Sequence, residues 1–229
     1  MAVTDDAIEA IKQMIVAGEL KPGDRLPRET VLADRLGLSR SSLREAIKAL
    51  TLIKVLTVRH GDGTYVTSLD PGMLMDALGF AVDFHRDDSV LQFLELRRVL
   101  EPAAAAVAAV TMSSEDIAGL GALLDELPPR PDIEDLVAND VEFHGRIAAA
   151  TGNPLWCSLL ETLSGRTQRA RIWRGLTQDR AVERTLEEHR AIQRSLAARD
   201  PEAARSWATV HIAGVEDWLH HALVPGNNP

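Results

Sequence analysis

Apolar residues recur at a helical period near the start of the chain. Ile8, Ile11 and Ile15 fall on one face of a predicted first helix. Thr4 is the predicted N-cap of this helix. Two glycines and two prolines within residues 18–27 predict a loop after it.

Two short helices are predicted after this loop. The first spans about residues 28–36 and ends at Gly37, because glycine readily closes a helix. The second begins after Ser39, a good N-cap, and runs to about residue 52. Two helices joined by so few residues favour a helix-turn-helix.

The period then changes to that of β-strands. Within residues 55–67, VLTVR and TYVT flank the turn HGDG, which predicts a β-hairpin. LDPG at 69–72 is a predicted linker.

From residue 73 onward, the pattern is helical, with breaks at Pro, Gly, Ser and Asp. The predicted helices span 73–85, 90–111, 114–126, 133–151, 155–175, 179–198 and 201–223. The fold is therefore predicted to be mainly α. A winged helix-turn-helix of three helices and a β-hairpin would precede an all-α antiparallel bundle of six or seven helices. The expected domains are 1–68, a linker with a connecting helix at 69–87, and the bundle at 88–223.

Charge is unevenly divided between the two parts. The 229 residues carry a net charge of -9. Residues 1–68 hold ten Lys or Arg against nine Asp or Glu, a balance of +1; the remainder holds fifteen against twenty-five, a balance of -10. The acidic total thus hides a nearly neutral first part with local basic patches, and local arrangement matters most for nucleic-acid affinity.

Composition also bears on the cellular compartment. No apolar run approaches the roughly 20 residues that a membrane span needs. The acidic, amphipathic N-terminus is not a secretory signal. Cys157 is the single cysteine, so no intrachain disulfide can form. We expect a soluble cytoplasmic protein with no membrane partner.

The third predicted helix carries a basic face. Arg40, Arg44 and Lys48 are spaced four apart, opposite the apolar positions of the same helix. Arginine can pair with the O6 and N7 edge of guanine, so this face suits the major groove of DNA. The alternative is a solvated basic face on a surface helix.

Residues around this helix fit the same interpretation. Ser39, Ser41 and Ser42 crowd its N-terminus, where free backbone N–H groups and the helix dipole attract phosphate. Arg59 and His60 lie near the tip of the predicted hairpin, which would form a wing beside the DNA.

Four residues of the bundle could form a metal site. Asp140 and His144 share one helical face at i, i+4, and His189 and His211 lie on two later predicted helices. Such a set suits zinc, nickel, manganese or iron. The alternative is that each histidine is a hydrogen-bonded core residue and that Asp140 caps the helix or pairs with Arg146.

The first part resembles a known family. LKPGDRLPRETVLADRLGLSRSSLREAIKAL, followed by GDGTYV, is similar to the winged helix of the GntR family of bacterial transcription regulators. The resemblance implies that Arg40 and Arg44 contact bases. It also implies contacts to phosphate or the groove for four residues: Ser39, Ser41, Ser42 and His60. Gly61 and Gly63 match the turn of the wing.

The sequence departs from the family pattern at three places. Arg28-Glu29-Thr30 stands where the family often has Ser-Glu-Arg, so Arg28 is a candidate replacement for the arginine that position 30 lacks. Lys54 stands where a glycine usually ends the recognition helix; a left-handed non-glycine residue there costs on the order of 1 kcal/mol. Asp62 in the wing would face phosphate unfavourably.

The second part resembles the FCD ligand-binding domain of the FadR subgroup. The similar pieces are ELRRVLEPAAA, D.EFH, GNP, EHRAI and ARDPEAAR. The resemblance implies a divalent metal bound by four residues: Asp140, His144, His189 and His211. We expect zinc, with nickel, manganese or iron as alternatives. It further implies a small organic acid as effector.

Several arginines are candidates to bind that acid. Arg97, in the similar ELR motif, is the first, and Arg166 and Arg169 follow, with Arg171 on the same predicted helix. The alternative for Arg97 is a structural pair with Glu101 at i, i+4.

Together these features predict a regulator rather than an enzyme. A homodimer would bind a pseudo-palindromic operator in double-stranded DNA, usually as a repressor, and respond to a small carboxylic or sugar acid. Two alternatives stay open: an acyl-CoA sensor without metal, and a hydrolase that uses a metal-bound water.

Overall fold

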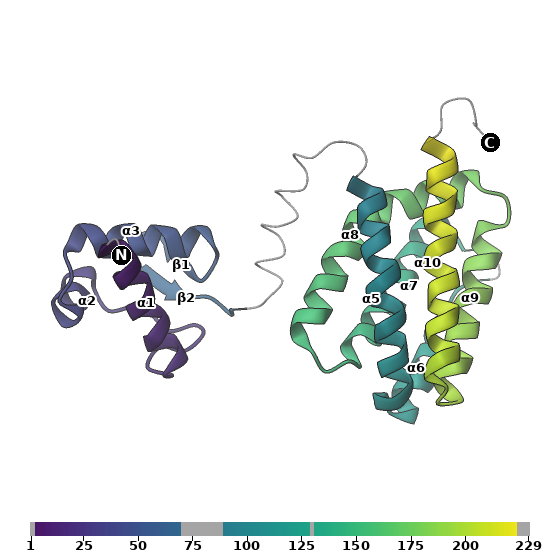
Figure 1. The fold of residues 1–229 in the computed structure, drawn as a ribbon, viewed down its shortest axis with the longest axis horizontal. Coiled ribbons are helices and arrows are strands. Elements are labelled where there is room, and N and C mark those ends of the chain that lie inside the picture. Colours follow the sequence, from purple (N-terminus) through teal and green to yellow (C-terminus); the bar gives the residue numbers. More distant parts are fainter. Residues whose placement is uncertain (1–2, 70–88, 129–130, 224–229) are drawn as a thin grey trace. The chain divides into compact units, whose positions relative to one another are not determined.

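The computed structural model describes residues 3–69, 89–128 and 131–223 (Figure 1). The chain divides into two compact units, residues 1–77 and 78–229. The predicted helix at 73–85, and all but the first residue of the predicted connection at 69–87, lie outside the described residues.

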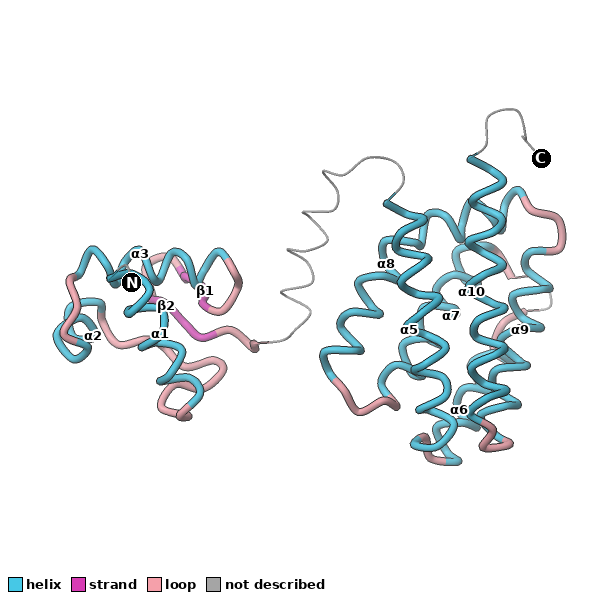
Figure 2. The backbone as a smooth tube through the Cα atoms, viewed as in Figure 1, coloured by secondary structure: helices cyan, strands magenta, loops and turns pink. Residues whose placement is uncertain are grey.

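The described part of the first unit, residues 3–69, contains three helices and a β-hairpin, as predicted (Figure 2). Its elements are α1 (Val3–Val16), α2 (Glu29–Leu36), α3 (Arg40–Leu52), β1 (Leu56–Arg59) and β2 (Gly63–Val66). The strands pair antiparallel from Leu56 opposite Val66 to Arg59 opposite Gly63. All three helices and the hairpin contribute to one core, which includes Ile11, Leu32, Leu43 and Leu56.

Two of the predicted caps are confirmed and one is wrong. Gly37 ends α2 in the left-handed conformation, with φ of 66°. Ser39 caps α3, and its hydroxyl accepts a hydrogen bond from the backbone N–H of Ser42. Thr4 is not an N-cap, because α1 already includes Val3 and Thr4 therefore lies inside the helix.

The second unit is all-helical in its described part. Its elements are α5 (Ser89–Thr111), α6 (Ser114–Asp125), α7 (Ile133–Ala149), α8 (Pro154–Thr177), α9 (Ala181–Ala197) and α10 (Pro201–Leu223). These bounds lie close to the predicted ones. Pro154 and Pro201 open α8 and α10, where a missing N–H costs nothing.

Helix packing leaves room for a polar centre in this unit. The long helices α5 and α10 lie side by side, and α7 packs on α8 (Figure 1). Phe143, Leu120 and Ile192 belong to its main apolar core. Charged and imidazole side chains from α5, α7, α8, α9 and α10 are nevertheless buried in the same unit. Burial of so many polar groups is costly without partners, so their arrangement locates the candidate site.

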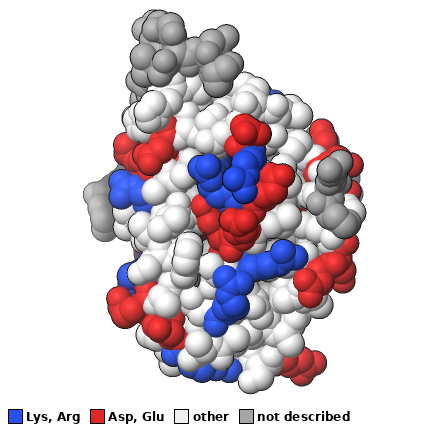
Figure 3. Space-filling model, turned by 90° about the vertical axis from the view of Figure 1, so that its right-hand side faces the viewer, with Lys and Arg blue, Asp and Glu red and all other residues white. Residues whose placement is uncertain are grey.

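The surface carries charges of both signs. On the face shown in Figure 3, Lys and Arg side chains lie next to Asp and Glu side chains, and neither sign forms a broad patch. This face therefore lacks the single-sign field that holds a DNA backbone. Among the described helices, none is long and apolar enough to cross a membrane.

Candidate DNA-binding surface and metal centre

Helix α3 has the two faces that its sequence predicts. Arg40, Arg44 and Lys48 are exposed, while Leu43 and Ile47 on the opposite side are buried. The ion pairs of Arg44 and Lys48 leave both cations exposed to solvent. Arg44 pairs with Glu29 of α2 at 3.0 Å, and Lys48 pairs with Glu45 at 2.8 Å. Exposed pairs of this kind are weak, so a phosphate or a base edge can replace the carboxylate.

Three serine hydroxyls gather at the N-terminus of α3. The Ser39 hydroxyl lies 2.9 Å from that of Ser41 and 2.8 Å from that of Ser42. Ser39 and Ser41 are exposed, and Ser42 is half-buried. The first backbone N–H groups of a helix point outward together with the positive end of its dipole, and this arrangement attracts phosphate.

The wing has a supporting residue that sequence reasoning missed. Arg25 donates to the backbone carbonyl of Asp62 and lies 3.6 Å from its carboxylate. Tyr65 donates to the same carboxylate at 2.6 Å, and Arg59 lies over the Tyr65 ring. One cation, Arg25, therefore stands beside the negative charge of Asp62. Arg25 also approaches Gly63 so closely that a Cβ at that glycine would clash with it.

The remaining predicted residues of the wing and of the α2 N-terminus are at the surface. Arg28, the N-cap residue of α2, is exposed, as are Arg59 and His60. Gly61 makes the turn between the strands with φ of 76°, a conformation that favours glycine.

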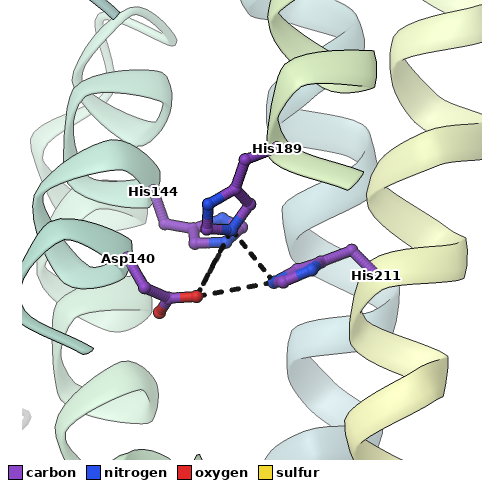
Figure 4. A group of neighbouring side chains, drawn as sticks. All are labelled: Asp140, His144, His189 and His211. Carbon is purple, nitrogen blue, oxygen red and sulfur yellow. Dashed lines mark hydrogen bonds and ion pairs between the residues drawn. The ribbon is translucent and has the colours of Figure 1, made fainter. Parts of the chain in front are cut away.

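The four predicted metal ligands come together from three helices (Figure 4). Asp140 Oδ1 lies 3.4 Å from Nε2 of His189, 3.5 Å from Nε2 of His211 and 3.7 Å from Nε2 of His144. The Nε2 atoms of His189 and His211 are 3.3 Å apart. All four residues are buried, and their candidate ligand atoms lie within 4.8 Å of one another.

These distances fit a single divalent ion. Two ligands about 2.1 Å from one tetrahedral zinc ion stand about 3.4 Å apart. Nε2 of His144 is buried and has no hydrogen-bond partner among the described residues, although it faces the carboxylate of Asp140. A buried polar atom without a partner usually signals a missing group. The donor set therefore fits a metal.

Two carboxylates hold the rings from behind. Nδ1 of His144 lies 2.8 Å from Glu101 Oε2, and Nδ1 of His211 lies 2.9 Å from Glu188 Oε2. A carboxylate at Nδ1 places the proton on that nitrogen and leaves Nε2 free as a ligand. Burial favours the neutral form too, because it lowers the pKa of all three imidazoles, that of His189 furthest below its ordinary value. Neutral imidazole is the form that binds metal.

Asp140 is held by an arginine of α8. Arg171 donates through Nη1 to Asp140 Oδ2 and through Nη2 to the backbone carbonyl of Ser164 at 2.7 Å. The suggested pair between Asp140 and Arg146 is absent from the described contacts, since Arg146 donates to Glu142 at 2.7 Å. Oδ1 of Asp140 is thus left toward the three imidazoles.

The candidate effector arginines occupy different environments. Arg97 is fully buried; its Nε donates to Glu101 at 2.5 Å and its Nη1 donates to Thr167 at 2.7 Å. Arg166 is half-buried and Arg169 is exposed. The structural pair with Glu101 is therefore present, and Arg171 is the α8 arginine that reaches the candidate ligands.

Sequence reasoning missed Glu101 and Glu188 as partners of the histidines, and it missed the buried Arg174. A signal was present in α8. Its buried polar residues recur at helical spacing: Ser164, Thr167, Arg171 and Arg174. Such a series marks one inward face.

Comparisons with known proteins agree with this architecture. The family model for bacterial regulatory proteins of the gntR family matches residues 3–66, and the FCD domain model matches residues 92–214. The chain belongs to the GntR family. The second unit of this GntR-family regulator carries an FCD domain, and LutR, one of its relatives, is a regulator of transcription.

Individual relatives cover most of the chain. The HTH-type transcriptional regulator LutR of Bacillus subtilis is 32% identical over 212 residues, which cover 90% of this chain and 96% of LutR. The galactonate operon transcriptional repressor of Escherichia coli is 27% identical over 179 residues, which cover 75% of this chain and 78% of that protein. Among solved structures, Streptococcus agalactiae GntR matches with a TM-score of 0.73 and 29% identity, covering 94% of this chain and 99% of that one.

Proposed function

We propose that this GntR-family protein is a metabolite-responsive repressor of the FadR subgroup. It binds a pseudo-palindromic operator as a homodimer, and a small carboxylic or sugar acid bound at a metal centre modulates that binding. One observation carries the proposal: a unit with an exposed basic helix is joined to a unit with a buried Asp and three His that fit one ion.

The first domain, residues 1–68, would place α3 in the major groove. Arg40 and Arg44 would contact base edges there, because bidentate arginine reads guanine. Lys48 and the serines at the N-terminus of α3 would contact phosphate. Arg28, at the start of α2, and three residues of the wing would add further contacts; the wing residues are Arg59, His60 and Gly61. Two copies of α3 in a dimer would read two half-sites.

The second domain, residues 88–223, would hold the metal. Asp140, His144, His189 and His211 would be its ligands, and zinc is the expected ion, with nickel, manganese or iron as alternatives. When bound, the ion supplies a Lewis acid that attracts a carboxylate. Glu101 and Glu188 hold two of the imidazole rings in the required tautomer.

Buried charge supports an acidic effector. Apart from Glu216, which pairs with Arg98, the buried Arg, Lys, Asp and Glu residues of the described chain are three cations and three anions. These are Arg97, Arg171 and Arg174, with Glu101, Asp140 and Glu188. They balance before an ion binds, and a divalent ion adds two positive charges. An anionic ligand would offset that excess, which is costly in a buried site.

Effector binding would act on DNA affinity through linkage. An acid can shift the operator equilibrium only by as much as its affinity differs between the two states of the dimer. The name of one relative supports both the repressor role and a sugar acid as effector, since the Escherichia coli protein is a galactonate operon transcriptional repressor.

Operator binding tests the proposal directly. Arg40→Ala and Arg44→Ala should each weaken binding to the native upstream region by about tenfold or more, because one bidentate base contact contributes about 1–3 kcal/mol. Lys12→Ala, in an exposed pair on α1, is the matched control and should bind like the wild type. Unchanged binding by the double variant Arg40→Ala, Arg44→Ala would remove α3 as the recognition helix.

A further inference from the structure

A cavity of about 380 Å³ lies between α7 and α8 and reaches the candidate metal centre. At its inner end are His144 and Glu101, both buried. Glu161 and Gln168, both exposed, line its mouth. The volume is within the range of small-molecule pockets, roughly 300–1,000 Å³. A small void of about 10 Å³ shares His144, Glu101 and Leu160 with it.

Two glycines keep this cavity wide. Gly145 of α7 and Gly165 of α8 both line it, and a Cβ added to either would meet nothing within 4 Å. Close packing between helices therefore does not require glycine at these positions. Gly175 of α8 differs, because its Cβ would stand 2.9 Å from Ile133. Glycine inside a helix is destabilising relative to alanine, so two such residues on one cavity indicate a use for the open space.

Except for Nε2 of His144, which faces Asp140, the polar groups that line the inner part of the cavity have partners among the described residues. Glu101 accepts from Arg97 and holds His144 at Nδ1. The Ser164 hydroxyl accepts from Arg171 at 3.0 Å. Besides that nitrogen, the Glu161 and Gln168 side chains line the cavity, and both are at the mouth.

The other wall residues are apolar. They are Ala138, Val141, Ala148 and Leu160. A ligand body against such walls gains by burying apolar surface, whereas buried hydroxyls would lose their water without replacement hydrogen bonds.

From this cavity, and resting on the proposed function of the metal centre, we propose that the effector is an acid with an apolar body. Its carboxylate or 2-hydroxycarboxylate group faces the His144 end of the cavity, and a short branched alkyl or aryl group lies between α7 and α8. This narrows the ligand class: polyhydroxylated sugar acids lack the apolar surface that these walls select.

The test compares acids that share a head group on the full-length, zinc-loaded protein. Calorimetric titration would use glycolate, which has no body, 2-hydroxy-4-methylpentanoate and mandelate, which have apolar bodies, and gluconate and galactonate. The two apolar acids should bind at least about tenfold more tightly than glycolate, because each buried methylene contributes about a fourfold gain. The sugar acids should bind no more tightly than glycolate.

Gly165→Leu tests the location. The leucine would fill the cavity, so 2-hydroxy-4-methylpentanoate should fall to the affinity of glycolate, while glycolate affinity and bound zinc stay at wild-type values. Gly119→Leu is the control. It makes the same change of helix propensity on α6, which does not line the cavity, and should leave the preference for apolar acids intact. Gly165→Ala is a milder form of the Gly165→Leu test and should weaken the binding of 2-hydroxy-4-methylpentanoate only in part.

The outcomes separate this inference from the function on which it rests. Galactonate binding more tightly than mandelate, or an apolar preference that survives Gly165→Leu, would overturn the inference and leave an acid-responsive regulator in place. Failure of every acid, glycolate included, to bind the zinc-loaded protein would overturn both.

Discussion

Nδ1 of His211 lies 2.9 Å from the carboxylate of Glu188, the residue directly before His189 in the sequence. One turn of α9 thus provides both a candidate ligand and the residue that orients another. Such carboxylates make a ligating imidazole more basic and fix its tautomer. We therefore expect Glu188→Gln to weaken metal affinity by about 10- to 100-fold without removing a ligand. Competition with a chelating indicator would measure this.

The neighbouring carboxylate gives the control. Glu187 is exposed, so Glu187→Gln should keep wild-type metal affinity. Equal affinity in the two variants would show that Glu188 does not support a metal ligand.

Metal removal should destabilise the second unit. A ligand that binds only the folded state adds about 2.7 kcal/mol at a concentration one hundred times its Kd. For a domain of about 150 residues this corresponds to a Tm lower by about 5–10 °C after chelation. The four tryptophans, Trp156, Trp173, Trp207 and Trp218, all lie in the second unit, so their fluorescence follows its unfolding.

Loss of one metal-binding side chain should abolish the effect of the chelator on the Tm. His144→Ala, measured with and without chelator, should give one Tm. If wild-type protein shown to contain metal keeps its Tm after the metal is stripped, the metal does not stabilise the fold.

Sequence period was sufficient to locate the described helices, because apolar spacing and end signals are local. Pro154, Pro201, Gly37 and Ser39 all mark helix ends in the structure. The N-cap prediction at Thr4 was wrong because a hydroxyl near the start of a helix fits either the N-cap or the first turn. The residues before it decide between these two positions.

The site was only partly accessible to the same reasoning. Asp140 and His144 share a face at i, i+4, but the meeting of His189 and His211 with them depends on how α9 and α10 pack. The spacing of polar residues in α8 marks the face on which Arg171 lies, but its partner was hidden. That partner is Asp140 on α7, which accepts from Arg171, and no spacing within α8 identifies it.

The burial of Arg97 predicts a structural role. It is fully buried and paired with Glu101, so removing it would leave a buried carboxylate uncompensated. Breaking a buried ion pair costs about 3–5 kcal/mol. We expect Arg97→Met to lower the free energy of unfolding of the second unit by that amount, with or without effector, as measured by urea titration of tryptophan fluorescence.

Exposed Arg169, on α8, is the comparison. Arg169→Ala should change the free energy of unfolding by less than about 0.5 kcal/mol, since exposed substitutions rarely do more. Arg97 would instead be an effector residue if Arg97→Met unfolds like the wild type yet no longer gains stability from a bound acid.

The backbone just after α3 is strained at Lys54. Lys54 follows α3 with φ of 63°, in the left-handed region that disfavours residues with a Cβ. Its backbone N–H donates to Thr51 and its carbonyl accepts from Thr67, and glycine would keep both bonds. Lys54→Gly should therefore stabilise the first unit by about 1 kcal/mol. Calorimetry of the full chain would detect this as a higher Tm for the first unit. Tryptophan fluorescence does not report that transition, because all four tryptophans lie in the second unit. Lys54→Ala removes the same charge but keeps the Cβ, so it should show no such gain; equal stabilisation by alanine and glycine would assign the effect to charge and not to backbone strain.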